Sequence, residues 1–161
     1  MRWWTRRDTP EVLWIEEQIR GSAALKEEDF LRLLEQLHTI GMVEIELGKV
    51  VGFIVYSLYK NRIHIETWGV HPMYGDEILE RMFHKMKQKL KLASRHSLSV
   101  EVSEKEEKMH FFLRKMKFLA KNVTVGDDCD NYWFVFSLKE QLQHEPRGIL
   151  EVKAHYNAHL S

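Results

Sequence analysis

Apolar and polar residues alternate along the chain in blocks of two kinds. Segments such as 42–47 and 97–102 are apolar at every second residue, as half-buried strands are. Segment 76–92 repeats its apolar residues at three and four positions, as an amphipathic helix does. The strands are expected at 1–4, 42–47, 50–59, 63–70, 97–102, 120–125 and 131–138. The helices are expected at 8–19, 25–38, 76–92 and 105–116.

These elements predict the order β-α-α-β-β-β-α-β-α-β-β. Asp8 or Thr9 would cap the first helix, and Leu37 would lie on the buried face of the second. A turn at Gly48-Lys49 would join the second and third strands in an antiparallel meander. The strand at 97–102 can pair in parallel with the one at 63–70 through the long helix between them. The fold class expected is α/β, or α+β with a mixed sheet and helices on both faces.

The length and composition predict a single domain over residues 1–138 and a polar C-terminal tail over 139–161. Lys plus Arg and Asp plus Glu both number 24, so the formal net charge is zero. This balance argues against a general nucleic-acid binder or a membrane binder. The helix 76–92 carries a basic face, which is either a solvated surface or a docking surface for a partner.

Other features of the sequence indicate a cytoplasmic protein without a metal site. The start of the chain lacks the apolar core of a secretion signal, and no apolar run approaches the length of a membrane span. Cys129 is the single cysteine, so no internal disulfide can form. The nine histidines are scattered rather than set at ligand spacing beside acids, and no metal ligand is assigned.

The stretch "WGVHPMYGDEILE" raises the first functional question. A strand ends at Val70, a turn follows at Pro72, and a helix opens near Asp76. A strand followed by a tight turn and a helix N-terminus is a common anion-binding arrangement. The alternative is purely structural: Asp76 would cap the helix, and Glu77 would lie where the helix dipole favours negative charge.

The order and spacing of four segments resemble the GCN5-related N-acetyltransferase (GNAT) superfamily over roughly residues 1–138. Within it the chain is most similar to ribosomal-protein-alanine N-acetyltransferases. The segments are "TRRDTPEVLWIEEQ", "GKVVGFIVY", "HIETWGVHPMY" and "LSVEVSEKEEKMHFFLRKMKF". The resemblance implies a cleft between the fourth and fifth strands that holds acetyl-CoA. The pantetheine arm would run along the backbone of the fourth strand, and the pyrophosphate would rest on the loop that opens the long helix.

Carried onto this sequence, the resemblance assigns the cofactor to Trp68 and Val70 on the fourth strand and to four loop positions. The signature residues of the loop are absent. The Arg or Gln position is Gly75, the Gly position is Ile78, and the Gly or Ala position is Glu80. Asp76 and Glu77 make the loop acidic, and a carboxylate about 5 Å from a phosphate costs about 3 kcal/mol at an effective dielectric near 20. The loop positions are Gly75, Asp76, Ile78 and Glu80.

Three further positions depart from the family pattern. Glu106 stands where the resemblance implies an Asn that contacts the cofactor or a water. Lys117 replaces the Gly of a "GF" pair. The loop "VTVGDDCDN" has no tyrosine to protonate the leaving thiolate, since Tyr132 follows too late.

His64 and Glu66 are the candidate catalytic residues. They lie two apart in "IHIETW" and therefore share one face of the sheet. Acetyl transfer to an amine needs a base, and this pair could accept the proton directly or through water. The alternative is a polar sheet edge or a paired internal charge. Trp68 shares the same face, where its indole could fill the cofactor or substrate slot.

The sequence therefore favours a GNAT-fold protein that descends from N-acetyltransferases. Its acetyl-CoA binding would be weakened or lost, and it would act as a non-catalytic binding protein for an unidentified protein partner. The alternative is an active acetyl-CoA-dependent N-acyltransferase whose acceptor is a protein N-terminus or another primary amine.

Overall fold

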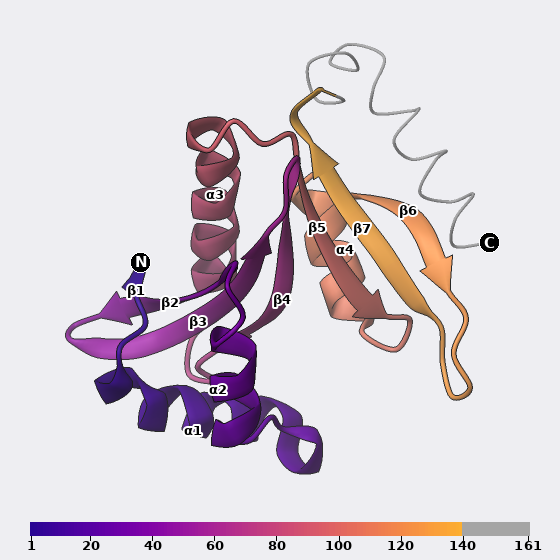
Figure 1. Ribbon diagram of the computed structural model, residues 1–161. Helices are drawn as coiled ribbons and strands as arrows, with labels where there is room; N and C mark the ends of the chain where they lie inside the picture. The colour runs from indigo at the N-terminus through magenta and orange to yellow at the C-terminus, as the bar shows by residue number, and fades with distance from the viewer. Residues whose placement is uncertain (140–161) are drawn as a thin grey trace. The chain divides into compact units, whose positions relative to one another are not determined.

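The computed structural model describes residues 1–139 (Figure 1). The predicted order of helices and strands is confirmed, with two added turns of 3-10 helix, Arg6–Asp8 and Gly21–Ala23. The helices are α1 (Thr9–Arg20), α2 (Glu27–Leu34), α3 (Asp76–Leu92) and α4 (Glu107–Lys115). The strands are β1 (Arg2–Trp3), β2 (Thr39–Glu46), β3 (Lys49–Leu58), β4 (Arg62–Val70), β5 (Ser97–Ser103), β6 (Leu119–Thr124) and β7 (Asn131–Ser137). Apart from Lys139, the tail predicted for 139–161 lies outside the described residues.

The strands form one mixed sheet in the order β1-β2-β3-β4-β5-β7-β6, so the predicted fold class is confirmed. The chain divides into two compact units. The first comprises Met1–Tyr59 and Ile65–Lys89, and the second comprises Lys60–His64 and the residues from Leu90 onward. Strand β4 therefore contributes its first residues to the second unit and the rest to the first. No helix within residues 1–139 has both the length and the apolar character needed to cross a membrane.

In the first unit, α1 and α2 cover one face of β2 and β3 (Figure 1). Val12 and Ile15 of α1 and Phe30 of α2 are fully buried against Val43 and Phe53 of these strands. The ring of Phe30 meets Phe53 edge to face with the ring centres 5.7 Å apart. Burying an aromatic or branched side chain contributes about 1.5–3 kcal/mol each, so this cluster fixes both helices on the sheet.

Helix α3 packs on the opposite face of β3, where Gly52 makes room for it. A Cβ at Gly52 would lie 3.2 Å from Cγ2 of Ile78 and 3.1 Å from Sδ of Met82. Both α3 side chains are buried, as the apolar stripe predicts. The missing side chain at Gly52 therefore sets how closely the start of α3 approaches the sheet.

The predicted basic face of α3 is partly engaged with β2. Nζ of Lys85 lies 3.0 Å from both carboxylate oxygens of Glu44, which is 3% exposed. The guanidinium of Arg81 lies 2.9 Å from Glu46 and 3.5 Å from Glu44. The ammonium of Met1 also lies 3.5 Å from Glu44. Arg81 and Lys85 thus neutralise carboxylates of the sheet rather than forming a free surface.

Two local predictions are wrong. The β2–β3 turn is Leu47-Gly48, not Gly48-Lys49, because both turn residues have positive φ (49° and 77°) and Lys49 pairs with Glu46. Such a two-residue turn matches the twist of a hairpin. Leu37 is 90% exposed rather than buried, because α2 ends at Leu34 and leaves no further helical turn before β2 begins at Thr39.

In the second unit, α4 packs on the β5–β7–β6 sheet. The buried face includes Val100 and Val102 of β5 and Phe134 of β7, and the ring centre of His110 lies 5.0 Å from that of Phe134. β7 pairs antiparallel with both β5 and β6, so it is the central strand of this unit.

Helix α4 ends in a Schellman motif. The amide of Phe118 donates to the carbonyl of Leu113 (2.9 Å), and the amide of Lys117 donates to the carbonyl of Arg114 (3.0 Å). Lys117 has φ of 70°, a left-handed conformation that glycine adopts most easily.

Candidate functional site

The turn after β4 is held by hydrogen bonds within the turn and by one to β3. The amide of His71 donates to the carbonyl of Val51 on β3 (2.8 Å), and the amide of Tyr74 donates to the carbonyl of His71 (2.9 Å). The amide of Met73 donates to Nδ1 of the His71 ring (3.1 Å). This turn leads directly into α3, which begins at Asp76 as the sequence predicts.

The carboxylate of Glu77 folds back onto the loop that opens α3. Its Oε1 lies 3.2 Å from the amide nitrogen of Gly75 and accepts a hydrogen bond from it. A Cβ at Gly75 would lie only 2.7 Å from Oε2 of Glu77, so a side chain at position 75 would make the end of the Glu77 side chain shift. The prediction that Asp76 precedes and caps the helix is wrong: Asp76 is already its first helical residue, and the longer side chain of Glu77 reaches back to the amide.

Asp76, Ile78 and Glu80 are the positions on α3 that the resemblance assigns to the cofactor, and they differ in burial. Ile78 is 1% exposed, and its side chain lies against Gly52, within the core of the first unit. Its amide donates to the carbonyl of Gly75 at 3.3 Å. Glu80 and Asp76 are accessible to solvent, Asp76 more so.

Trp68 and Val70 are partly exposed residues of β4. The Trp68 ring meets Phe83 of α3 edge to face, with the ring centres 6.5 Å apart. The carbonyl oxygen of Trp68 accepts a hydrogen bond of 2.9 Å from the guanidinium of Arg20. The backbone of β4 is therefore bound at this point by a side chain from α1.

Arg20 belongs to a buried charge network that sequence reasoning missed. It binds the carboxylate of Glu16, one turn earlier on α1, and that side chain is fully buried. Oε2 of Glu16 also accepts from the amide of Leu25 (2.9 Å). The four-residue spacing of Glu16 and Arg20 was the available signal, since such pairs face each other on a helix. The Trp68 carbonyl had no signal in the sequence.

The structure places the two candidate catalytic residues in unlike environments. His64 is 9% exposed; its Nδ1 lies 2.8 Å from Oγ of Ser99, and its ring stacks on Trp133 with centres 4.6 Å apart and planes 9° apart. The guanidinium of Arg62 lies 5.4 Å from the centre of the Trp133 ring. Glu66 is partly exposed on β4. His64 is thus held within the second unit, while Glu66 belongs to the first.

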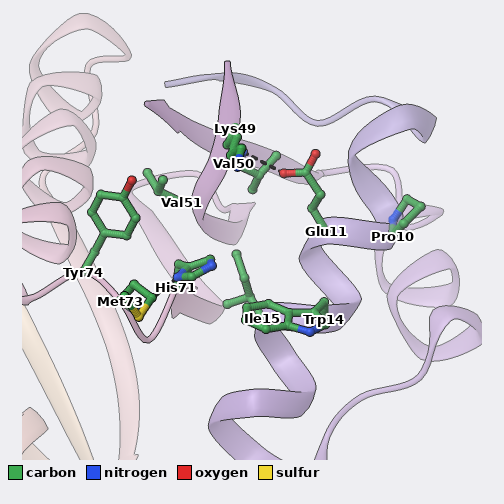
Figure 2. Close-up of a pocket in the computed structure, with 10 residues that line it drawn as sticks. All are labelled: Pro10, Glu11, Trp14, Ile15, Lys49, Val50, Val51, His71, Met73 and Tyr74. Atoms are coloured by element: carbon green, nitrogen blue, oxygen red, sulfur yellow. Dashed lines mark hydrogen bonds between the residues drawn. The ribbon is translucent and has the colours of Figure 1, made fainter. Parts of the chain in front are cut away.

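A pocket of about 430 Å³ opens in the first unit between α1, the start of β3 and the turn after β4 (Figure 2). Three aromatic rings contribute to its wall. His71 lies close to Trp14, with ring centres 4.9 Å apart and planes 33° apart, and Tyr74 stands perpendicular to His71 at 5.7 Å. Figure 2 shows the Glu11 carboxylate across the pocket from these rings, where it accepts a hydrogen bond of 2.8 Å from the Val50 amide.

No protein-family model and no curated protein matches this sequence. Solved structures do match it. The ribosomal-protein-S18-alanine N-acetyltransferase from Escherichia coli has a TM-score of 0.72 at 15% identity, covering 84% of this chain and 91% of that one. Ard1 from Thermoplasma volcanium has a TM-score of 0.70 at 19% identity, covering 84% and 95%. An aminoglycoside 6'-N-acetyltransferase complexed with coenzyme A has a TM-score of 0.70 at 10% identity, covering 84% and 94%.

The chain has the GNAT acetyltransferase fold. Several positions that the family resemblance assigns can now be described on this GNAT fold. Glu106 is the residue before α4, and Lys117 keeps a glycine-like backbone at the end of that helix. Tyr132 is the second residue of β7 and is buried, with its ring centre 5.2 Å from that of His110. The Tyr132 hydroxyl therefore belongs to the α4 side of the second unit, and the β6–β7 loop itself contains no tyrosine.

Proposed function

We propose that this protein is a non-catalytic binding protein built on the GNAT fold, with weakened or lost affinity for acetyl-CoA. The observation that carries the proposal is the hydrogen bond from the Gly75 amide to the Glu77 carboxylate. In the family resemblance this loop receives the pyrophosphate. Here a negative side chain of the protein already occupies the position of an anionic ligand on that amide.

The residues of this loop do not fit a pyrophosphate for electrostatic reasons. Asp76 and Glu77 both lie in the first turn of α3, where their charge already balances the helix dipole. Each carboxylate near a phosphate at about 5 Å costs about 3 kcal/mol at an effective dielectric near 20, and exposure to solvent reduces that figure. Even a third of it is about a sixfold loss of affinity.

The fourth strand supports the same proposal. The resemblance implies that a pantetheine arm bonds to the backbone of this strand. In this chain the carbonyl of Trp68 already accepts from Arg20, and Arg20 is held by the buried Glu16. A ligand that needed this carbonyl would have to displace a guanidinium that also neutralises a buried carboxylate.

The alternative function is an active acetyl-CoA-dependent N-acyltransferase acting on a protein N-terminus or another primary amine. It is favoured by the likeness to the aminoglycoside 6'-N-acetyltransferase complexed with coenzyme A, which shares the fold. Glu66, partly exposed on β4, would then be the candidate base, with His64 assisting.

Thermal unfolding with acetyl-CoA separates the two functions. A ligand at a hundred times its Kd stabilises the folded protein by about 2.7 kcal/mol. We expect no shift in Tm at micromolar acetyl-CoA, and ADP serves as the control for non-specific nucleotide effects. A clear rise with acetyl-CoA but not with ADP overturns the proposal.

Catalysis is tested separately with radiolabelled acetyl-CoA and a panel of peptide and small primary amines. We expect no transfer above the rate without protein. If transfer is detected, Glu66→Gln and His64→Ala should abolish it when these residues supply the base. Transfer that survives both substitutions would assign the base elsewhere while still excluding a non-catalytic protein.

A further inference from the structure

The pocket of the first unit is lined by His71, Met73 and Tyr74 of the turn after β4 but not by Gly75 or the α3 residues that follow, and it has a chemistry of its own (Figure 2). We propose that it binds an organic cation of the methylated ammonium class, such as a trimethylammonium group with a short apolar or hydroxylated substituent. The inference goes beyond the proposed function and stands whether or not acetyl-CoA binds elsewhere on the protein.

The aromatic residues give the pocket two surfaces at right angles. The rings of His71 and Trp14 are tilted by 33° with their centres 4.9 Å apart, and Tyr74 stands at 90° to His71. The faces of aromatic rings carry partial negative charge and attract cations within about 6 Å. Methyl groups on a quaternary nitrogen can contact both surfaces at once, and they gain from the apolar lining that Ile15 and Val51 add.

Glu11 supplies a negative charge at the pocket that a backbone hydrogen bond holds in place. One oxygen of Glu11 accepts from the Val50 amide at 2.8 Å, which orients the carboxylate across the cavity from the rings. Lys49 also lines the pocket, but its side chain is exposed and free to turn into solvent. An anionic ligand would face the anchored carboxylate of Glu11, whereas a cationic ligand displaces only a mobile lysine.

The Nδ1 atom of His71 is engaged by the backbone of its own turn. Its Nδ1 accepts a hydrogen bond from the Met73 amide, so that nitrogen carries a lone pair rather than a proton. A neutral imidazole adds an aromatic surface without repelling a cation. The hydrogen bond from the Met73 amide also fixes the orientation of the His71 ring beside the pocket.

The shortage of hydrogen-bond acceptors favours a methylated nitrogen over a primary ammonium. A primary ammonium has three donors that need partners when it is buried. The side chains lining the pocket offer the second oxygen of Glu11 and the hydroxyl of Tyr74. A quaternary nitrogen has no donor to satisfy, and a volume of about 430 Å³ is within the range of small-molecule sites.

The test is calorimetric titration of the full chain with choline and with its uncharged isostere, in which a tert-butyl group replaces the trimethylammonium group. Saturable binding of choline at least about tenfold tighter than the isostere supports the proposal. Equal affinity for the two compounds, or no saturable binding of choline, overturns it. The acetyl-CoA titration is a separate experiment, so either proposal can fail alone.

Three variants locate the site. Glu11→Gln keeps an acceptor for the Val50 amide but removes the charge, and Trp14→Leu removes one ring at a residue that is 45% exposed. Each should weaken choline binding about tenfold while Tm stays near the parent value. Glu17→Gln, an exposed carboxylate on the same helix, is the matched control and should bind like the parent. Binding that is unchanged in both pocket variants excludes this site.

Discussion

The guanidinium of Arg20 donates a hydrogen bond of 2.9 Å to the carbonyl oxygen of Trp68, 48 residues away in the sequence. The same group binds the fully buried carboxylate of Glu16. One side chain therefore compensates a buried charge on α1 and a backbone acceptor on β4. Because both partners depend on it, Arg20 should matter for the stability of the first unit.

Replacing Arg20 by Met should destabilise the protein by about 3 kcal/mol. Among residues 1–139 the buried Glu16 carboxylate would keep the Leu25 amide as its hydrogen-bond partner but lose its cation, and an uncompensated buried charge is costly. Urea unfolding at neutral pH measures the change. Arg20→Met combined with Glu16→Gln should recover part of the loss, and Arg32→Met, at an exposed position of α2, is the control. A loss below about 1 kcal/mol for Arg20→Met would show that the pair is not compensating a buried charge.

Removing the negative charges at the start of α3 should raise the affinity for acetyl-CoA. Glu77→Gln keeps a side-chain oxygen that can accept the hydrogen bond from the Gly75 amide. The substitution therefore removes the negative charge without removing the hydrogen bond. Together with Asp76→Asn we expect a gain of about tenfold to a hundredfold, measured by titration calorimetry. Glu28→Gln on α2, an exposed carboxylate in the first turn of another helix, should change nothing. Equal affinity in parent and double variant would remove the electrostatic basis of the proposed function.

Lys117→Gly should stabilise the protein by about 0.5 kcal/mol. A left-handed residue other than glycine costs roughly 1–2 kcal/mol, and the greater freedom of glycine in the unfolded chain offsets part of the gain. The readout is the midpoint of urea unfolding. Lys117→Ala keeps the strained backbone and removes only the side chain, so its midpoint should not rise. A gain as large in Lys117→Ala would mean that the lysine side chain, not φ, causes the strain.

Protonation of Asp8 in acid should lower the free energy of unfolding of the protein. The hydrogen bonds from the Arg2 side chain, at 2.8 and 2.9 Å, and those from the backbone amide and the hydroxyl of Thr5 lower the pKa of Asp8 from 3.8 to about 2. A carboxyl whose pKa is lowered by folding contributes fully above its unfolded pKa, and the contribution disappears as pH falls toward the folded pKa. The loss should therefore fall between about pH 4 and pH 2 and amount to at most about 2 kcal/mol, since Arg2 is half exposed.

The measurement for Asp8 is the free energy of unfolding as a function of pH. Asp8→Asn should be less stable than the parent at neutral pH and should show a shallower decline in acid. Asp127→Asn, in the exposed loop between β6 and β7, should keep the parent's slope. A parent-like slope in Asp8→Asn would contradict the assignment.

The order of elements could be predicted because each helix and strand carries its own periodicity. The boundaries of these elements were harder to predict, since the Leu47-Gly48 turn depends on the register between β2 and β3 and the end of α2 depends on where β2 begins. The same limit applies to the site. The sequence shows directly that the loop is acidic. It does not show which carboxylate accepts the hydrogen bond from the Gly75 amide, because that depends on the residue at which α3 begins. His64 and Ser99 are 35 residues apart, and no local pattern links them.

The packing of Ile78 against Gly52 has a consequence for how this chain can change over evolutionary time. Replacing Ile78 by a small residue would empty a buried site and destabilise the fold by about 3 kcal/mol or more. A side chain added at position 52 does not simply fill that space, because its Cβ would still lie 3.1 Å from Sδ of Met82 and 3.2 Å from the carbonyl oxygen of Gly69. Position 78 is therefore constrained by packing as well as by whatever the loop binds, so a single substitution there changes the stability of the first unit.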